Sequence, residues 1–174
     1  RQSGAPEEIL LSDSGTGRPE IADYLAGLPA GSSVTLLPDA LFADLALVDT
    51  PSGIMAVAPW PTPARAIDHA ADSVVLDGIQ DPGNVGSILR SAAAAGFRQI
   101  LLSVDCAQVW SPKTLRAAMG AHFQLDIHEG CDLAGFLCAY RGCAVATALA
   151  ASTTLYAASL EGSLAWVFGS EGQG

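Results

Sequence analysis

The sequence of 174 residues is short of charge, and of positive charge above all. Charged residues make up 15% of the chain, with 8 Lys and Arg against 18 Asp and Glu, so the formal net charge is −10. This balance argues against a surface that is basic all over, as in general nucleic-acid binders. Four of the eight basic residues nevertheless fall close together, at Arg90, Arg98, Lys113 and Arg116. A local positive site on an acidic protein therefore stays open.

Long apolar runs and paired cysteines are also absent. No apolar stretch approaches the roughly 20 residues that cross a bilayer, and the start, RQSGAPEE, lacks the features of a signal peptide. The cysteines form no CxxC pair and have no histidine at zinc-ligand spacing; they are Cys106, Cys131, Cys138 and Cys143. We expect small buried residues in a reducing cytoplasm, with no metal and no disulfide bond. The three scattered histidines are assigned no chemistry.

Half of the residues are hydrophobic, and from residue 72 onward they alternate regularly between strands and helices. Strands are predicted at DSVVLDGI, QILLSVD, FQLDIHE, CAVATALA and SLAWVF. Helices are predicted at NVGSILRSAAAAGF, SPKTLRAAMGAHF and DLAGFLCAYRG. This order favours right-handed crossovers and an α/β fold, with helices on both faces of a parallel sheet. Ligands of such sheets bind beyond the C-terminal ends of the strands.

The first third of the chain predicts a smaller α/β domain over residues 1–62. Helices are expected at PEIADYLAGL and at DALFADLALV, the second capped by its Asp, and strands at SSVTLLP and GIMAVAPW. Residues 63–71, next to two prolines, form the predicted linker to a second domain, 72–174.

The turn after the first strand of the second domain, QDPGNVGSILR, is the first candidate site. We expect Pro82 and Gly83 to form a tight turn, Asn84 to cap the helix, and Gly86 to let a backbone or ligand approach. Arg90 would then point along the rim of the site. A capped helix with a solvated arginine explains the local features as well. A dinucleotide fingerprint is excluded because G-x-G-x-x-G is absent.

The second candidate is the turn FGSEGQG, which follows the last predicted strand. Its glycines can adopt unusual backbone angles and approach a ligand closely, and Glu171 among them is a useful hydrogen-bond acceptor. Taken alone, the segment is equally consistent with a flexible turn.

Together the two turns resemble the SpoU (TrmH) family of RNA ribose 2′-O-methyltransferases, within the SPOUT superfamily. DPGNVGSILRSA resembles the family's first motif and FGSEGQG its second, while SPKTLRAAMGAHF is similar to the helix between them. The resemblance covers residues 72–174, and more loosely residues 1–62 resemble the L30e-like domain that recruits substrate RNA. The third motif, which completes the trefoil knot, has no counterpart before Gly174. The resemblance therefore implies a C-terminally truncated SPOUT α/β-knot domain behind a partial L30e-like domain.

The resemblance implies methyl transfer from S-adenosylmethionine to a ribose 2′-hydroxyl of RNA. Its catalytic residues would be Arg90, Asn84 and Glu171. Because a guanidinium stays protonated and is a poor base, we expect Arg90 to bind the neighbouring phosphate and to stabilise the forming alkoxide. Asn84 would orient the substrate or Arg90, and Glu171 would anchor the network.

The same resemblance implies binding residues and partners. The cofactor would contact mainly backbone groups, at Ala146, Thr147, Gly169, Ser170 and Gly172. RNA would contact Arg90, Lys113 and Arg116. Ribosomal RNA is expected ahead of tRNA as the substrate, and a homodimer through the C-terminal knot region is expected, with no membrane association.

Two other functions stay open. A non-catalytic RNA-binding or ribosome-associated module with the same fold fits the acidic composition. A nucleotide-binding protein of the flavodoxin type fits the strand order but lacks a phosphate loop.

Overall fold

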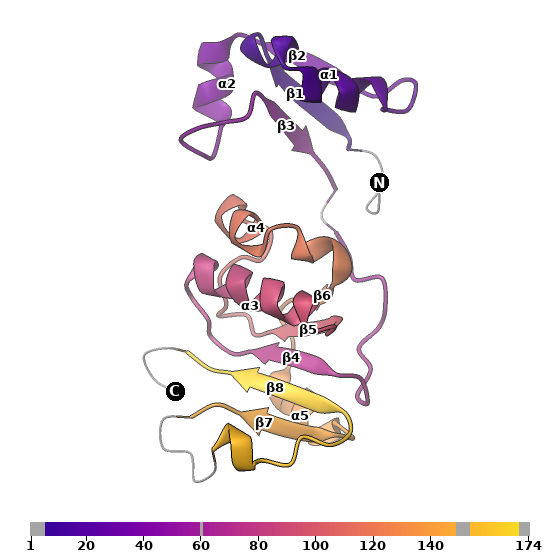
Figure 1. The fold of residues 1–174 in the computed structure, drawn as a ribbon, viewed down its shortest axis with the longest axis vertical. Helices are drawn as coiled ribbons and strands as arrows, with labels where there is room; N and C mark the ends of the chain where they lie inside the picture. Colours follow the sequence, from indigo (N-terminus) through magenta and orange to yellow (C-terminus); the bar gives the residue numbers. More distant parts are fainter. Residues whose placement is uncertain (1–5, 60, 149–153, 171–174) are drawn as a thin grey trace. The chain divides into compact units, whose positions relative to one another are not determined.

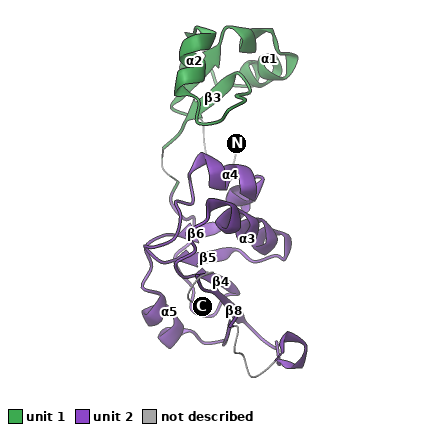
Figure 2. Ribbon diagram, turned by 90° about the vertical axis from the view of Figure 1, so that its left-hand side faces the viewer, with its two compact units in different colours: residues 1–61 green, residues 62–174 purple. Residues whose placement is uncertain are grey.

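The computed structural model describes residues 6–59, 61–148 and 154–170. The chain divides into two compact units, residues 1–61 and 62–174 (Figures 1 and 2). Among the described residues, no helix combines the length and the apolar character needed to cross a membrane.

The first unit is a three-stranded mixed sheet in the order β2-β1-β3. The central strand β1 (Glu8–Ser12) pairs in parallel with β2 (Val34–Leu37) and antiparallel with β3 (Ile54–Val57). A 3₁₀ turn, η1 (Ser14–Gly17), and two helices, α1 (Pro19–Ala26) and α2 (Asp39–Leu45), connect the strands. The buried apolar side chains of this unit are Ile9, Leu11, Ile21 and Phe42.

Two features of the first unit differ from the sequence expectation. Strand β1 was not predicted, although it is the centre of the sheet. The predicted Asp cap of α2 is wrong, because Pro38 is the N-cap residue and Asp39 lies inside the first turn. The Asp39 carboxylate instead accepts a hydrogen bond from the Ser14 backbone N–H at 2.9 Å. Hydrogen bonds from Ser14 lower the pKa of Asp39.

The second unit contains an all-parallel sheet of five strands in the order β6-β5-β4-β8-β7 (Figure 1). Its strands are β4 (Ser73–Leu76), β5 (Gln99–Leu102), β6 (Asp126–His128), β7 (Cys143–Ala146) and β8 (Leu164–Phe168). Each of them falls within a predicted strand. Short 3₁₀ turns, η2 (Ala121–Gln124) and η3 (Leu155–Ala157), precede β6 and β8.

Helices cover both faces of this sheet, as predicted. Helices α3 (Pro82–Ala94) and α4 (Pro112–Ala118) share one core with alternate residues of β4 and β5, among them Leu76 and Ile100. Helix α5 (Leu133–Ala139) packs its Phe136 with Val75 and Leu101, which point to the other face. Because successive side chains of a strand alternate between faces, strands buried on both sides must be apolar throughout.

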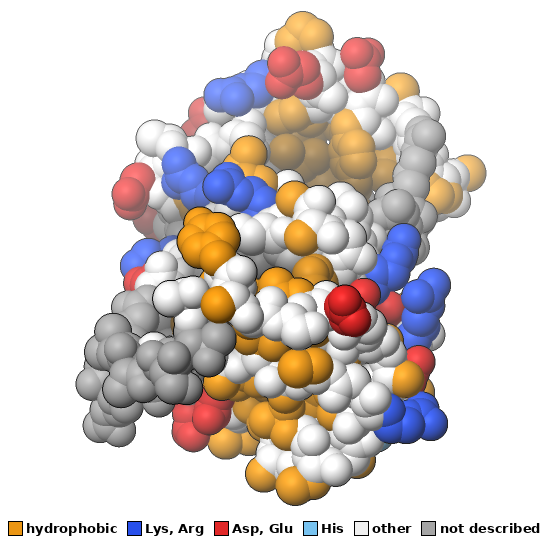
Figure 3. All heavy atoms as spheres, turned by 60° about the horizontal axis from the view of Figure 1, so that its bottom comes forward, with side chains coloured by type: hydrophobic (Ala, Val, Ile, Leu, Met, Phe, Trp, Pro, Cys, Tyr) orange, Lys and Arg blue, Asp and Glu red, His pale blue; other side chains and the backbone are white. Residues whose placement is uncertain are grey.

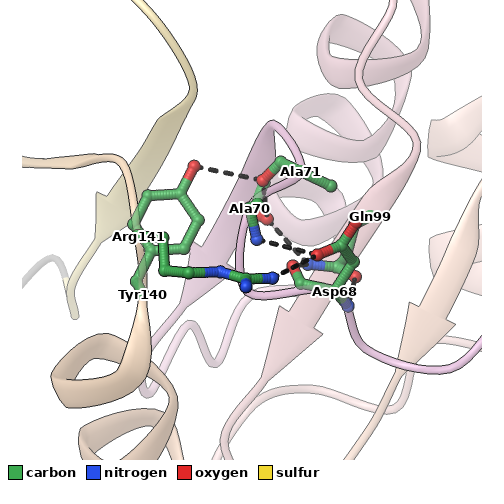
Figure 4. A network of polar contacts seen from close by, with 7 residues as sticks. Asp68, Ala70, Ala71, Gln99, Tyr140 and Arg141 are labelled. Atoms are coloured by element: carbon green, nitrogen blue, oxygen red, sulfur yellow. Dashed lines mark hydrogen bonds and ion pairs between the residues drawn. The ribbon is translucent and has the colours of Figure 1, made fainter.

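Residues 68–71, which the sequence assigns to the linker, are bonded to the second unit (Figure 4). The side-chain amide of Gln99 donates to the Asp68 carbonyl at 2.9 Å and accepts from the Asp68 N–H at 2.7 Å. The Tyr140 hydroxyl donates to the Ala71 carbonyl at 3.1 Å, and Arg141 lies 3.6 Å from the Asp68 carboxylate. Since Gln99 is buried, its bonds anchor this segment beside the starts of β4 and β5.

The expectation of buried cysteines is half wrong. Cys138 and Cys143 are exposed, while Cys106 and Cys131 are half-buried. All four thiols are free, and no cluster of potential metal ligands occurs in the part of the chain that the structure describes. Burial raises the pKa of the Cys131 thiol, which disfavours its reactive thiolate form.

Candidate functional site

The candidate site lies at the sheet edge where β4, β7 and β8 end. Beyond β4 and β8, the Asp77 N–H donates to the Phe168 carbonyl at 2.9 Å. Beyond β7, the Thr147 N–H donates to the Val167 carbonyl at 3.2 Å. The chain runs from β4 outward to β5 and β6 on one side, whereas β8 and β7 lie on the other. The two predicted turns therefore meet where strand order reverses, the usual ligand site of open α/β sheets.

Gly78 brings the two turns into contact. Its φ is +65°, and a Cβ built on it would lie 3.7 Å from the Cβ of Ser170 in the turn after β8. Its N–H donates to the Ser103 hydroxyl at 2.9 Å, which ties the turn to the end of β5 as well. Since a left-handed backbone angle favours glycine, this position fixes the path of the chain out of β4. The sequence prediction did not single out Gly78 or Ser103.

Helix α3 begins earlier than the sequence suggests, so the predicted cap is wrong. Asp81 is the N-cap residue, and its carboxylate accepts from the Asn84 backbone N–H at 2.8 Å. Pro82 is the first residue of the helix and Gly83 the second, so they do not form a separate tight turn. Proline suits this position because it has no N–H to leave unbonded and its φ is already helical. The Asn84 side chain, half-buried in the first turn, is thus not needed as a cap.

Gly86 allows α3 and α4 to approach each other. This agrees with the prediction that Gly86 lets another backbone come close. A Cβ built on Gly86 would lie 2.8 Å from the Thr114 carbonyl oxygen and 2.9 Å from the Ala118 backbone nitrogen. No real side chain tolerates such distances from backbone atoms. This crossing sets the position of α4, which carries Lys113 and Arg116, against α3, which carries Arg90.

Asn84 and Arg90 lie on the same helix but on different sides of it. Six residues separate them, and at about 100° per residue their directions differ by about 120° around the axis. Arg90 follows Gly86 by four residues and so lies near the side that faces α4. Its side chain is exposed and makes no ion pair within the described ranges of the chain. The structure therefore brings Asn84 to the strand ends and leaves Arg90 at the rim.

An apolar groove of about 460 Å³ runs along the other side of α3. Ser87 and Ser91 of α3 face it across from Trp166 and Phe168 of β8. Figure 3, which turns the β7–β8 end of the molecule forward, shows hydrophobic side chains exposed on this side. The groove also reaches Ala95 and Phe97, beyond the end of α3 and away from the strand ends. We therefore do not assign it to the cofactor.

The residues expected to hold the cofactor have small side chains at the ends of β7 and β8. Ala146 and Thr147 are exposed, and Gly169 and Ser170 are half-buried. Because these side chains are small, a ligand can reach their backbone N–H and carbonyl groups. Gly172, also expected to hold the cofactor, and Glu171, expected to be catalytic, lie outside the described residues, so their predicted roles stay predictions.

The residues expected to contact RNA on α4 are both at the surface. Lys113 and Arg116 are exposed. Ser111 caps α4 through its hydroxyl, which accepts from the Thr114 N–H at 3.3 Å, and Pro112 is the first helical residue. The helix ends at Met119, whose φ of 51° is left-handed. Nothing in the sequence indicates this angle, because left-handed positions normally favour glycine or asparagine.

Comparison with known proteins gives consistent results for the second unit. A sequence model described as the SpoU rRNA Methylase family matches residues 72–174. The chain is 38% identical over 116 residues to human "rRNA methyltransferase 3, mitochondrial", covering 60% of this chain and 28% of that protein. It is 32% identical over 127 residues to the Bacillus subtilis "23S rRNA (guanosine(2553)-2′-O)-methyltransferase RlmP", covering 73% and 48%. The chain thus spans less than half the length of either relative.

A solved structure shows the same fold. The SpoU methyltransferase AviRb from Streptomyces viridochromogenes, in complex with the cofactor AdoMet, superposes with a TM-score of 0.84. The match covers 99% of this chain and 69% of that one at 19% sequence identity, a level at which the likeness concerns the fold alone. The predicted α/β class, with a parallel sheet between helices, is confirmed.

Proposed function

Because the chain belongs to the SpoU rRNA methylase family, we propose that it transfers a methyl group from S-adenosylmethionine to a ribose 2′-hydroxyl of RNA, ribosomal RNA above all. The observation that supports the proposal most is that the segments leading into the two family motifs leave the adjacent parallel strands β4 and β8 side by side, with the Asp77 N–H bonded to the Phe168 carbonyl. The RlmP relative, named for 2′-O-methylation of 23S rRNA, supports the ribose hydroxyl as the target. Methylation of tRNA is the second candidate.

The strand ends suit the cofactor because they combine small side chains with accessible backbone groups. In this proposal Ala146 and Thr147 after β7, and Gly169, Ser170 and Gly172 after β8, hold S-adenosylmethionine through their main chain. The AdoMet complex of a protein with the same fold is in keeping with this assignment. When bound, the cofactor supplies a methyl group on a positively charged sulfur, which is a good leaving group. The chain's own residues have to align the ribose and control its charge.

The position of Arg90 suits a role toward RNA. An exposed guanidinium at the rim can bind the phosphate beside the target ribose, and it stabilises negative charge as the 2′-oxygen loses its proton. The guanidinium is a poor base and does not accept that proton, which passes to solvent water as the oxygen–methyl bond forms and the sulfur–methyl bond breaks. Asn84, on the first turn of α3 at the strand ends, would orient the ribose. Glu171 completes the proposed set as an acceptor.

The remaining proposals concern the assembly and the first unit. We place a homodimer interface in the C-terminal knot region and an L30e-like substrate-recruiting role in residues 1–62, with residues 63–71 as the linker. Two basic and eight acidic residues in the first unit mean that any RNA contact there depends on shape and hydrogen bonds more than on charge. A cytoplasmic location stays a prediction, and the human relative carries a mitochondrial name.

The proposal is tested with the full-length protein. Titration calorimetry with S-adenosylmethionine measures cofactor binding, and incubation with total RNA and labelled cofactor measures transfer, followed by mapping of the modified nucleotide. Arg90→Ala should lower the transfer rate by about 100-fold or more, as for other groups that stabilise developing charge, and leave the cofactor Kd unchanged. Arg98→Ala, which removes another exposed arginine of the same unit, is the matched control.

Each outcome decides between the functions. Cofactor binding without transfer to any RNA would favour the non-catalytic module. No cofactor binding would contradict the proposal as a whole. Normal turnover of Arg90→Ala would remove Arg90 from the mechanism while leaving the reaction in place.

A further inference from the structure

We propose that the outer face of α4 and the turn after it bind a single-stranded segment of RNA, with the ring of Phe123 stacking on a base. This inference rests on the proposed function, because it takes RNA as the substrate, and it deepens that function by naming the surface. Phe123 and Met119 are the new residues. Lys113 and Arg116 precede them on α4.

The four residues form one outward-facing stripe, which we name the α4 stripe. Lys113, Arg116, Met119 and Phe123 follow one another at intervals of three or four residues, and all are exposed. The inner side of the same segment is buried, at Thr114, Ala118, Ala121 and His122. A spacing of three residues places Lys113 and Arg116 on one side of α4, and Met119 and Phe123 follow them in the exposed turn after the helix.

The backbone after α4 holds Phe123 at the surface. Met119 and Gly120 both have left-handed angles, with φ of 51° and 85°, which end the helix and redirect the chain. Phe123 donates its N–H to the Gly120 carbonyl at 3.2 Å, and a Cβ on Gly120 would lie 3.9 Å from the Phe123 ring. That distance is an ordinary van der Waals contact, so the left-handed backbone angle, and not the space beside the ring, is what favours glycine at this position. Phe123 stays 61% exposed and Met119 74% exposed.

The layer beneath the α4 stripe is fixed in place. The buried His122 ring lies 4.9 Å from the Trp110 ring, centroid to centroid, and its Nε2 is 2.9 Å from the Val109 carbonyl oxygen. Thr114 donates its hydroxyl to the Gln108 carbonyl at 2.9 Å. Because these contacts hold Thr114 and His122 in place, they also fix the position of the turn that carries Phe123. A surface set in its bound conformation loses little freedom on binding.

The charges of the α4 stripe favour RNA as the occupant. Lys113 and Arg116 make no ion pair in the ranges that the structure describes, so both can bind phosphates. Glu129 is close enough to His122 to act on its pKa, which means that the surroundings are not uniformly basic. Two cations followed along the chain by two exposed apolar side chains match a base with an adjoining stretch of phosphates, since aromatic rings stack on unpaired bases and cations follow the backbone.

The first test measures stacking. The full-length protein is titrated against a labelled single-stranded RNA of mixed sequence, about 12 nucleotides long, and binding is followed by fluorescence anisotropy. Phe123→Ala should raise the Kd about 10-fold or more, the effect of losing one stacked base. Phe123→Trp should bind about as tightly as the wild type, and Phe123→Leu should bind as weakly as the Ala variant. Val104→Ala, which truncates an apolar side chain that is 78% exposed in the same unit, should change nothing.

The second test measures charge. For a single strand, each phosphate contact contributes about 0.7 to the slope of log K against log salt. Arg116→Gln should therefore make that slope about 0.7 less steep, whereas Phe123→Ala should leave it unchanged. A thermal melt of each variant shows whether the fold is intact, and Phe123→Trp tests stacking even if Phe123→Ala is unstable.

The outcomes separate this inference from the proposed function. Wild-type RNA affinity in Phe123→Ala would overturn the inference, and methyl transfer would still stand. Wild-type RNA affinity in Phe123→Leu would also overturn the inference. An apolar side chain without an aromatic ring would then be enough for binding, so stacking on a base would not be the cause of the affinity. If the wild-type protein transfers no methyl group but the Phe123→Ala variant binds RNA more weakly than the wild type, the proposed RNA-binding surface is supported and the proposed methyl transfer is contradicted. With both intact, Phe123→Ala should raise KM for RNA and leave kcat unchanged.

Discussion

The two units of this chain differ in how far their apolar side chains are buried. In the second unit, β4 and β5 are buried along their whole length and covered by helices on both faces. Among the described residues of the first unit, four apolar side chains are buried, and many others stay exposed, among them Leu36, Leu41, Leu45 and Leu47. A sheet enclosed on both sides forms a rigid frame for a site, whereas the first unit leaves an extensive apolar surface open to partners.

The two units also differ in their content of basic residues. Residues 63–174 contain six basic residues, and residues 1–62 contain two. All cations to which we assign a role, Arg90, Lys113 and Arg116, lie on α3 or α4. Under the proposed function, the acidic chain would contact RNA through the few cations that lie together on the second unit.

The largest expected effect tests the contrast in burial. Leu101→Ala, at a fully buried position in β5, should lower the free energy of unfolding of the second unit by about 2–5 kcal/mol. Leu36→Ala, where the side chain is 56% exposed in edge strand β2, should change stability by less than about 0.5 kcal/mol. Urea unfolding followed by circular dichroism measures both. A large loss of stability in Leu36→Ala would contradict the difference in burial between the units, because it would mean that the Leu36 side chain is buried and not exposed.

The sequence predicts the second unit better than the first because its signals are local. A run such as SVVL or QILL has three consecutive apolar residues, VVL or ILL, a pattern typical of a central parallel strand that is buried on both faces. The strand β1, EILLS, has just as short a run. Its central place depends on pairing with strands about 25 and 45 residues further on, and this non-local pairing leaves no mark in the segment itself.

The candidate site was predictable in its location but not in its detail. That the segments after β4 and β8 begin side by side follows from the rule that parallel strands end at one edge, and the hydrogen bond from the Asp77 N–H to the Phe168 carbonyl agrees with it, while the meeting of the two motifs stays a prediction. The correct cap, Asp81, was signalled by Pro82 directly after it, and Asn84 was a competing cap residue only three positions away. The divergence of Asn84 and Arg90 follows from helix geometry. The left-handed angle of Met119 had no local signal at all.

A smaller effect tests whether the two units unfold independently. Gly86→Ala would push a methyl group into the backbone of α4, and we expect it to cost about 1–3 kcal/mol, as overpacking does. Gly15→Ala would do the same in the first unit, against the Gly53 carbonyl. Calorimetric scans should show two transitions, with each variant lowering only its own. A single transition lowered equally by both variants would instead show that the units fold together.

The control for this pair is Gly17→Ala. A Cβ on Gly17 meets no atom within 4 Å, and its φ is not among the positive values found for glycines in the described chain. We therefore expect a change of less than about 0.5 kcal/mol. A larger loss would mean that the strain at Gly15 and Gly86 is not the cause of their effects.

The smallest expected effect separates the units by pH. His122 and His128 lie in the second unit, and burial lowers the pKa of both below the ordinary value of 6.5. Nε2 of His122 faces a carbonyl oxygen and so carries the hydrogen, whereas Nδ1 is buried without a partner among the described residues. A proton on Nδ1 would place an uncompensated charge in the interior. The folded unit therefore takes up protons less readily than the unfolded chain.

The sign follows from linkage: stability is complete above pH 6.5 and falls as the pH drops from 6.5 through the lower pKa of the folded state. In the first unit the titrating group is Asp39, with a pKa below 3.8, so its loss begins only near pH 4. Melting temperatures measured between about pH 7.5 and pH 5 should fall for the second transition alone. His122→Gln keeps an N–H donor but does not titrate, so it should reduce the decrease of the melting temperature between these pH values. His128→Gln should remove the rest of that decrease. An equal fall in the double variant would show that other groups cause it.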